Sequence, residues 1–221
     1  MRADTSRGPL RLPVGELLST IPLTDLARAL HEERSASSLR FRALTFLNIM
    51  LRRRDFSDNT WMYVANPELK MSRIQEPKRR SAWMAPDGRT SIMIEIPCDV
   101  GDDVWRADAR ELSFRMSAEL ARLGFHADDA LGAFVVRVEH GYPIYHLGYE
   151  RDRQELLAAV ARFSNVRTAG RQGLFRYVFM DAAMQMGLEA ARQMMRGERQ
   201  GASIDAIGRS FVPLETTAIT A

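Results

Sequence analysis

Cysteine and lysine are scarce in this chain of 221 residues and long apolar runs are absent, and the first and last of these shortages each exclude a class of structure. Cys98 is the only cysteine, so no disulfide can form within the chain and no cluster of thiolates can hold a metal. No apolar run approaches the length of a membrane span, and the first residues lack the apolar core of a signal peptide. We therefore expect a cytoplasmic protein with no integral membrane segment.

The histidines and the charged residues give little support for a metal site or for a surface that binds nucleic acid. The four histidines form neither an HxxxH nor an HxH pair, so no metal site is expected. The net charge is +3 and Lys70 and Lys78 are the only lysines, so nearly all the positive charge is carried by arginine. The arginines are spread along the chain, which favours a coding bias over a nucleic-acid surface. No nucleic-acid partner is expected.

Strand and helix patterns mix without strict alternation, which predicts an α/β (α+β) fold in two parts. One part is a small α/β domain made of residues 14–37 and 164–197. The other, at 38–163, is an inserted domain with an antiparallel sheet of about four strands and two helices. Residues 1–13 are expected to be a frayed entry, and 198–221 a loose tail.

The helices are predicted from acidic caps and apolar spacing. Asp108 and Glu111 resemble a capping box that opens a helix at 109–123, and Asp152 and Glu155 repeat the pattern before a second helix. A third helix is expected over 181–196. Its predicted apolar face has helical spacing and consists of Met180, Met184, Leu188, Ala191 and Met195.

The most informative segment is residues 170–181, Gly-Arg-Gln-Gly-Leu-Phe-Arg-Tyr-Val-Phe-Met-Asp. A short strand is predicted just before it and the Met-rich helix just after it. A strand, a glycine turn and a helix start let backbone amides approach an anion, and an arginine on the turn adds a planar charged donor. The segment is therefore a candidate site for a cofactor that carries phosphate or an electron-rich ring.

Several motifs, in order along the chain, are similar to those of flavin-dependent enzymes. They are Leu18-Ser19-Thr20-Ile21-Pro22, Arg73-Ile74-Gln75, Met84-Ala85-Pro86, Glu95-Ile96-Pro97, Tyr142-Pro143-Ile144-Tyr145 and the segment at 170–181. Together they resemble the carboxy-terminal half of FAD-dependent amine-oxidase-like oxidoreductases, in the protoporphyrinogen-oxidase-like and UDP-galactopyranose-mutase-like branch. The resemblance implies that the domain at 38–163 is a substrate domain for a small molecule.

The resemblance also implies roles for the matched residues. The implied FAD-binding residues are Thr20, Pro22, Gly170, Arg171, Gly173, Met180, Asp181 and Met184. The implied substrate-binding residues are Arg73, Tyr142, Tyr145, Arg176 and Tyr177. A helix that begins at Met180 would present its amino end to the negative charge of a reduced flavin.

The residues also allow simpler interpretations. Arg171 could be a surface arginine beside a turn, and Met184 and Met195 could be core filler. Arg73 could bind a substrate carboxylate or phosphate, or it could pair with Glu95 across the sheet. The two tyrosines Tyr142 and Tyr145 could line a substrate site or simply pack beneath their loop.

The chain departs from the resemblance in half of the fold. Enzymes of this kind begin with a strand and a Gly-x-Gly-x-x-Gly turn, and no Gly-x-Gly occurs in this sequence. The predicted strand at 16–20 would then belong to a parallel sheet with neighbours missing, leaving an open edge. The expected function is the carboxy-terminal part of an FAD-dependent oxidoreductase that oxidises an organic substrate by hydride transfer. The first alternative is a redox-neutral flavin-dependent sugar-nucleotide mutase-type enzyme. The second is a non-catalytic fragment or split-enzyme subunit that does not hold flavin alone and whose partner is an amino-terminal chain bearing Gly-x-Gly-x-x-Gly.

Overall fold

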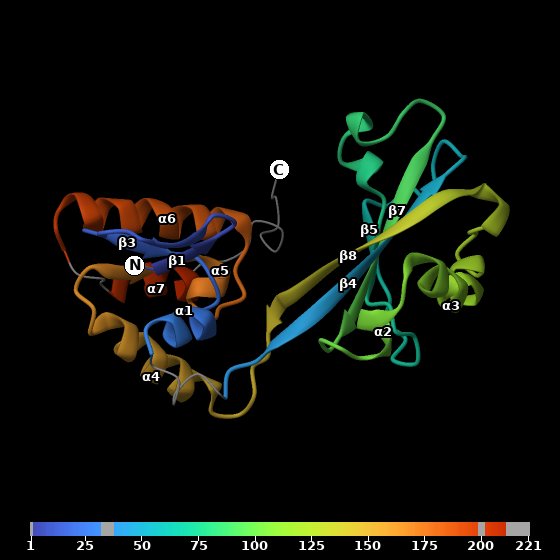
Figure 1. Cartoon of the computed structure of the whole chain (residues 1–221). Coiled ribbons are helices and arrows are strands. Elements are labelled where there is room, and N and C mark those ends of the chain that lie inside the picture. Colours follow the sequence, from blue (N-terminus) through green and yellow to red (C-terminus); the bar gives the residue numbers. More distant parts are fainter. Residues whose placement is uncertain (1, 32–37, 199–201, 211–221) are drawn as a thin grey trace. The chain divides into compact units, whose positions relative to one another are not determined.

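The computed structural model describes residues 2–31, 38–198 and 202–210, and the chain divides into two compact units. Unit 1 comprises residues 1–40 and 143–221, and unit 2 comprises residues 41–142. Figure 1 shows the elements of each unit. The expected split into a discontinuous domain and an insert therefore has its boundaries after Arg40 and after Tyr142, and not at 37/38 and 163/164.

Unit 2 is built on a five-stranded sheet in the order β5-β6-β7-β4-β8. Its strands are β4 (Phe41–Leu51), β5 (Trp61–Tyr63), β6 (Arg73–Gln75), β7 (Thr90–Cys98) and β8 (Ala130–Pro143). The pairs β4–β7, β5–β6 and β6–β7 run antiparallel. Alternating Ile92, Ile94 and Ile96 are fully buried, as the period of two predicts. The expected antiparallel sheet is confirmed, with β8 as a fifth strand.

One main helix covers the core of unit 2. The helix α3 (Ala109–Ala121) begins after Asp108, whose Oδ1 accepts a hydrogen bond from the Glu111 backbone N–H at 2.8 Å, so the predicted cap is confirmed. Its buried residues Leu112, Met116 and Leu120 pack against the sheet. The short elements of this unit are α2 (Asp103–Arg106), η2 (Pro77–Arg79), η3 (Ala82–Met84) and η4 (Ala127–Asp129).

Unit 1 contains a parallel pair, β3 (Leu17–Ser19) and β9 (Val166–Thr168). Its helices are α1 (Leu23–Ala29), α4 (Tyr149–Ala161), α5 (Gly170–Gly173), α6 (Met180–Met195) and α7 (Ala202–Ser210). The helix α6 lies on one side of β3, and α1 and α4 lie on the other side (Figure 1). The core beneath α6 includes Ala182, Met186 and Ala190, with Leu18 of β3 packed against it.

Three expectations about unit 1 are wrong. The first residues form an antiparallel hairpin, β1 (Arg2–Thr5) and β2 (Gly8–Arg11), because Gly8 adopts a φ of +105° that closes the turn. The helix α4 begins at Tyr149 after Gly148, whose φ is +88°, so Asp152 lies inside the helix and does not cap it. Residues 202–210 of the expected loose tail are the helix α7, with Ile204 fully buried. Residues 211–221 lie outside the described residues.

The predicted apolar face of α6 is also wrong, because it faces solvent within the described structure. The exposed fractions are 85% for Met180, 70% for Met184, 59% for Leu188 and 81% for Met195. The buried residues are Ala182, Met186, Ala190 and Gln193, about 180° around the helix at 100° per residue. Met184 and Met195 are therefore not core filler in this chain.

Candidate functional site

The candidate site lies where the two parallel strands of unit 1 end. The register pairs Leu17 with Val166 and Ser19 with Thr168, so both strands finish at the same edge of the sheet. Thr20, Ile21 and Pro22 connect β3 to α1, and Ala169 connects β9 to α5. In open α/β sheets, ligands bind outside the carboxyl ends of parallel strands. Two segments that are about 150 residues apart in the sequence thus come together in a position suited to a ligand.

The two glycines of α5 have different structural roles. A Cβ at Gly173 would lie 2.5 Å from Thr168 Oγ1 and 3.3 Å from the Ser19 carbonyl oxygen, so only glycine fits there. Gly170 has a φ of +80°, and a Cβ built on it meets no atom within 4 Å. Gly173 therefore fixes α5 against the β3 connection, while the backbone at Gly170 borders open space.

Arginine and tyrosine side chains surround the same turn. The Arg171 guanidinium carbon lies 4.3 Å from the centroid of the Tyr177 ring, a cation–π contact. The Tyr177 backbone N–H donates a hydrogen bond to Tyr145 Oη at 2.6 Å, and Tyr145 stacks on Tyr149 with ring centroids 4.3 Å apart. Burial raises the pKa of Tyr145, partly offset by that hydrogen bond. The predicted residues Arg171, Tyr145 and Tyr177 thus lie in one group within unit 1.

Backbone strain marks the segment between α5 and α6. Phe175 has a φ of +49° and a fully buried side chain. Bulky residues rarely adopt positive φ, and such outliers persist only where the surrounding structure holds them. The Phe175 ring contacts Tyr145 edge-on, with centroids 6.2 Å apart. The strained residue therefore belongs to the same aromatic group as the candidate site.

The start of α6 places three predicted cofactor residues on one helix. Phe179 is the N-cap residue and its side chain makes no capping hydrogen bond. Asp181 Oδ1 accepts a hydrogen bond from the Ala182 backbone N–H at 2.9 Å, as an acid in a first turn does. Met180 and Met184 are mostly exposed. Their cofactor roles stay predictions.

Arg176 is held by carboxylates that the sequence analysis did not select. Its guanidinium contacts Asp205 at 2.6 Å and Glu150 at 3.4 Å, and 13% of its side chain is exposed. Arg153, fully buried, pairs with the same two acids at 2.9 Å and 2.7 Å. Hydrogen bonds from Arg153 hold the pKa of Glu150 at about 2. A substrate role for Arg176 stays a prediction, because the charge already has partners in the protein.

Unit 2 brings the other two predicted substrate residues to a single carboxylate. Arg73 Nη2 lies 2.5 Å from Glu95 Oε2, and Tyr142 Oη donates a hydrogen bond to Glu95 Oε1 at 3.0 Å. Burial lowers the pKa of Arg73, but the buried Glu95 carboxylate more than offsets this, so the pKa is raised. The interpretation that Arg73 pairs with Glu95 across the sheet is confirmed.

The described residues contain neither a group of metal ligands nor a helix that could span a membrane. Among those residues, no three His, Cys, Asp or Glu side chains are grouped to hold a metal ion. Also within those ranges, no helix is long and apolar enough to cross a membrane.

No protein-family profile and no curated protein sequence matches the chain. Solved structures do match its fold, with low sequence identity. A reduced UDP-galactopyranose mutase matches with a TM-score of 0.74 and 18% identity, over 94% of this chain and 46% of that chain. A structure named for protoporphyrinogen oxidase, from Exiguobacterium sp. 255-15, matches with a TM-score of 0.63 and 15% identity, over 87% and 44%.

A putrescine oxidase bound to putrescine matches with a TM-score of 0.56 and 12% identity, over 82% of this chain and 42% of that chain. Identities this low establish the fold and not the activity. The expected resemblance is confirmed at that level, and the chain spans less than half the length of each of these three structures.

Proposed function

We propose that this chain is the carboxy-terminal part of an FAD-dependent oxidoreductase that oxidises a small organic substrate. The observation that carries the proposal is the meeting of the Thr20–Pro22 and Gly170–Gly173 connections at the carboxyl ends of β3 and β9. Sheets of this kind bind dinucleotides at that position. The single buried cysteine, Cys98, is compatible with work in a reducing cytoplasm.

The residues at this edge fit one portion of FAD. The backbone at Gly170 borders open space that a Cβ would occupy, so a ligand can approach the main chain there. Arg171 provides a permanent positive charge beside it, and Thr20 is exposed at the end of β3. When bound, the flavin supplies the site that accepts an electron pair from the substrate. The role of the chain is then to bind and orient, with Arg171 held in place by Tyr177.

A complete FAD site needs more than these residues. A glycine turn after a first strand cradles the pyrophosphate in dinucleotide-binding folds, and this sequence contains no Gly-x-Gly. We infer that a second polypeptide segment, bearing that turn, completes the site. The chain would then be one portion of an enzyme and not the whole catalyst.

A second candidate is a redox-neutral sugar-nucleotide mutase. The observation that favours it is the match with UDP-galactopyranose mutase over 94% of this chain, at a TM-score of 0.74. An anionic diphosphate substrate would need arginines that are free of internal carboxylates. Arg73 and Arg176 both have such partners, which weighs toward the oxidoreductase.

The experiment is a titration of the purified chain with FAD, followed by flavin fluorescence and absorbance. Because these residues form only part of the site, we expect weak binding that weakens further in Arg171→Ala, with Arg110→Ala, an exposed arginine of α3, as the matched control. Saturable binding that depends on Arg171 supports the proposal. If FAD does not bind, or binds equally to both variants, the chain does not use this edge to hold flavin by itself and the non-catalytic alternative is favoured.

A further inference from the structure

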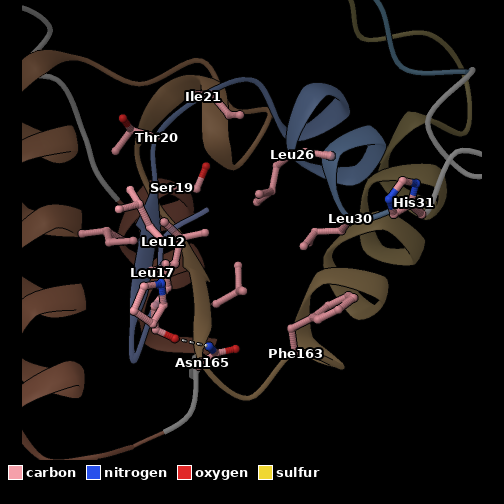
Figure 2. A pocket seen from close by; sticks show the side chains of 15 residues that line it. Leu12, Leu17, Ser19, Thr20, Ile21, Leu26, Leu30, His31, Phe163 and Asn165 are labelled. Atoms are coloured by element: carbon pink, nitrogen blue, oxygen red, sulfur yellow. Dashed lines mark hydrogen bonds between the residues drawn. The ribbon is translucent and has the colours of Figure 1, made fainter. Parts of the chain in front are cut away.

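Each unit has an open surface, and the two surfaces differ in chemistry. Unit 1 contains a hollow of about 790 Å³ that is lined by β3, α1 and the start of β9 (Figure 2). No Asp, Glu, Lys or Arg is among the described residues that line it, so it offers no such charge to select a partner. The open surface of unit 2 is the outer edge of β8, where apolar and charged residues alternate over 136–139.

The strand β8 lies at the edge of its sheet and has little protection there. It stands last in the order β5-β6-β7-β4-β8, so its side away from β4 has no neighbouring strand in the part of the chain that the structure describes. It is 14 residues long, contains no lysine, and has its only proline at its last residue, Pro143. Alternate residues of such a strand point their N–H and C=O groups to the open side. Natural proteins usually shorten, bend or charge an open edge, so this one is suited to pairing with another strand.

One face of β8 carries an exposed apolar row beside the open edge. Phe134, Val136 and Val138 are 50%, 46% and 38% exposed. They are two residues apart and so share a face, while Ala133 and Val135 on the other face pack against the core of unit 2. A strand that pairs with β8 would therefore also cover apolar surface.

The other face carries two charges that lack an oppositely charged partner. Arg137 and Glu139 are both exposed, and neither forms an ion pair with any residue that the structure describes. The Arg137 guanidinium donates hydrogen bonds to the carbonyl oxygens of Trp105 and Ala107, which hold it in place and leave its charge without a carboxylate. The two charged residues are separated by about 7 Å along the strand. A partner strand with the same two charges in the opposite direction would pair with both.

We propose that β8 pairs with β8 of a second copy of this chain, in an antiparallel register centred on Val138. Two copies of one strand related by a two-fold axis run antiparallel, and each contact between them occurs twice. In this register Arg137 of each copy lies opposite Glu139 of the other, and Phe134 lies opposite Tyr142. The five-stranded sheet of one copy continues into that of the other. The inference does not rest on the proposed function.

The charges select this register over its neighbours. Opposite charges directly across a strand pair stabilise it, and like charges destabilise it. A register centred on Arg137 or on Glu139 would place like charges opposite each other. One centred on Val136 would place Arg137 opposite Val135 and leave both charges unpaired. The register centred on Val138 forms two pairs of Arg with Glu.

Disulfide trapping in the purified full chain tests the register. Cys98 is the only native cysteine and is 2% exposed, so a cysteine introduced on β8 is the one that reacts. In the proposed register the two Val138 residues face each other, with Cα atoms about 4.5–5.5 Å apart, a separation that a disulfide spans. Val138→Cys should therefore form a covalent dimer on mild oxidation with copper phenanthroline.

Phe134→Cys is the matched control. Phe134 lies on the same face as Val138 and is more exposed, so random collision would favour it. In the proposed register, however, the two Phe134 residues are about 27 Å apart along the strands. We expect at least about tenfold more covalent dimer from Val138→Cys than from Phe134→Cys, because only the first pair meets disulfide geometry.

A charge reversal tests the contact between Arg137 and Glu139. Glu139→Arg, added to the Val138→Cys chain, should lower the yield of covalent dimer about threefold or more, because it places two pairs of like charges opposite each other. Glu68→Arg, the same change at an exposed position of unit 2 outside β8, should leave the yield unchanged. All three tryptophans lie in unit 2, so an unchanged emission spectrum shows that a variant keeps the fold of that unit.

Three results would overturn the proposal. Equal yields from Val138→Cys and Phe134→Cys would indicate random collision, and a yield that Glu139→Arg leaves unchanged would remove the charge pairing. If Val138→Cys forms no dimer, β8 does not pair with a second copy, and a strand of another polypeptide becomes the occupant to seek.

Discussion

Arg153 of α4 and Asp205 of α7 form a buried ion pair, and the two residues lie 52 positions apart in the sequence. Arg153 Nη1 lies 2.9 Å from Asp205 Oδ1, and the Arg153 side chain is fully buried. The same guanidinium donates to the Leu174 carbonyl oxygen at 3.2 Å and to Glu150. The pair fastens α7 to α4 and to the segment that leads into α6. It therefore stabilises the side of unit 1 that carries the candidate site.

Removal of the Asp205 carboxylate should destabilise unit 1. Asp205→Ala leaves the buried Arg153 with fewer carboxylate partners, and breaking a buried pair costs about 3 kcal/mol. Asp103→Ala is the matched control, because Asp103 pairs with Lys70 and Arg115 but is 58% exposed. Its loss should shift the urea midpoint far less, because solvent and salt screen an exposed ion pair. Urea unfolding followed by far-ultraviolet circular dichroism measures both, and equal losses would contradict a special role for the buried pair.

Tryptophan fluorescence separates the two units in that experiment. Trp61, Trp83 and Trp105 all lie in unit 2, so their emission reports that unit alone. Asp205→Ala should therefore shift the dichroism transition and leave the fluorescence transition in place.

Acid should weaken unit 1 over a defined pH window. The pKa of Glu150 falls from 4.5 to about 2, mainly through hydrogen bonds from Arg153, and the pKa of Asp205 is also lowered, because hydrogen bonds from three arginines outweigh its burial. A carboxyl with a lowered folded pKa contributes stability above its unfolded pKa and loses it as the pH falls. The free energy of unfolding should therefore decline from about pH 4.5 toward pH 2. Glu150→Gln should flatten this decline, and an unchanged pH profile would contradict the assignment.

The sequence predicted unit 2 more completely than unit 1, for physical reasons. The strand β7 buries isoleucine at alternate positions, Ile92, Ile94 and Ile96. The main helix α3 has an acidic cap at Asp108 that accepts the expected hydrogen bond. Both signals are local, and local patterns can be read from one sequence.

Unit 1 is decided by contacts between distant segments. The sequence of α6 carries two apolar faces, and the structure buries the one with small residues, Ala182 and Ala190, because α7 approaches closely. A Cβ at Gly208 of α7 would lie 2.6 Å from Met186 Cε, which shows how tight that approach is. The helix α7 itself depends on the Asp205 pair with Arg153, a contact that no local pattern indicates.

The candidate site was predicted in part. The two connections at 20–22 and 170–173 were selected from the sequence, and the parallel pairing of β3 with β9 brings them together. The carboxylates Glu150 and Asp205 were missed. A possible signal for them was the excess of arginine near the glycine turn, since buried arginines require acids.

Alanine at Gly173 should destabilise unit 1. The added Cβ would lie 2.5 Å from Thr168 Oγ1 and 3.3 Å from the Ser19 carbonyl oxygen, and overpacking of this kind costs about 1–3 kcal/mol. Gly187→Ala is the control within α6, where no neighbouring atom lies within 4 Å. That change should stabilise the helix by about 0.5–1 kcal/mol. Thermal unfolding of both variants measures the difference, and a stabilised Gly173→Ala would show that the close packing is absent in solution.

Glutamate substitutions at Met184 and Leu188, on the exposed face of α6, should reduce self-association of the chain without changing its folding. Met184 and Leu188 are 70% and 59% exposed, so Met184→Glu with Leu188→Glu removes an apolar surface without opening the core. We expect the purified chain to self-associate through this face, and the double variant to sediment as a smaller species with a similar melting temperature. Met186→Glu is the control, because Met186 is fully buried and a charge there should unfold unit 1. If sedimentation velocity gives the same species for the native chain and the double variant, this face takes no part in association of the isolated chain. If the double variant melts at a much lower temperature, the exposed face instead contributes to the folded core.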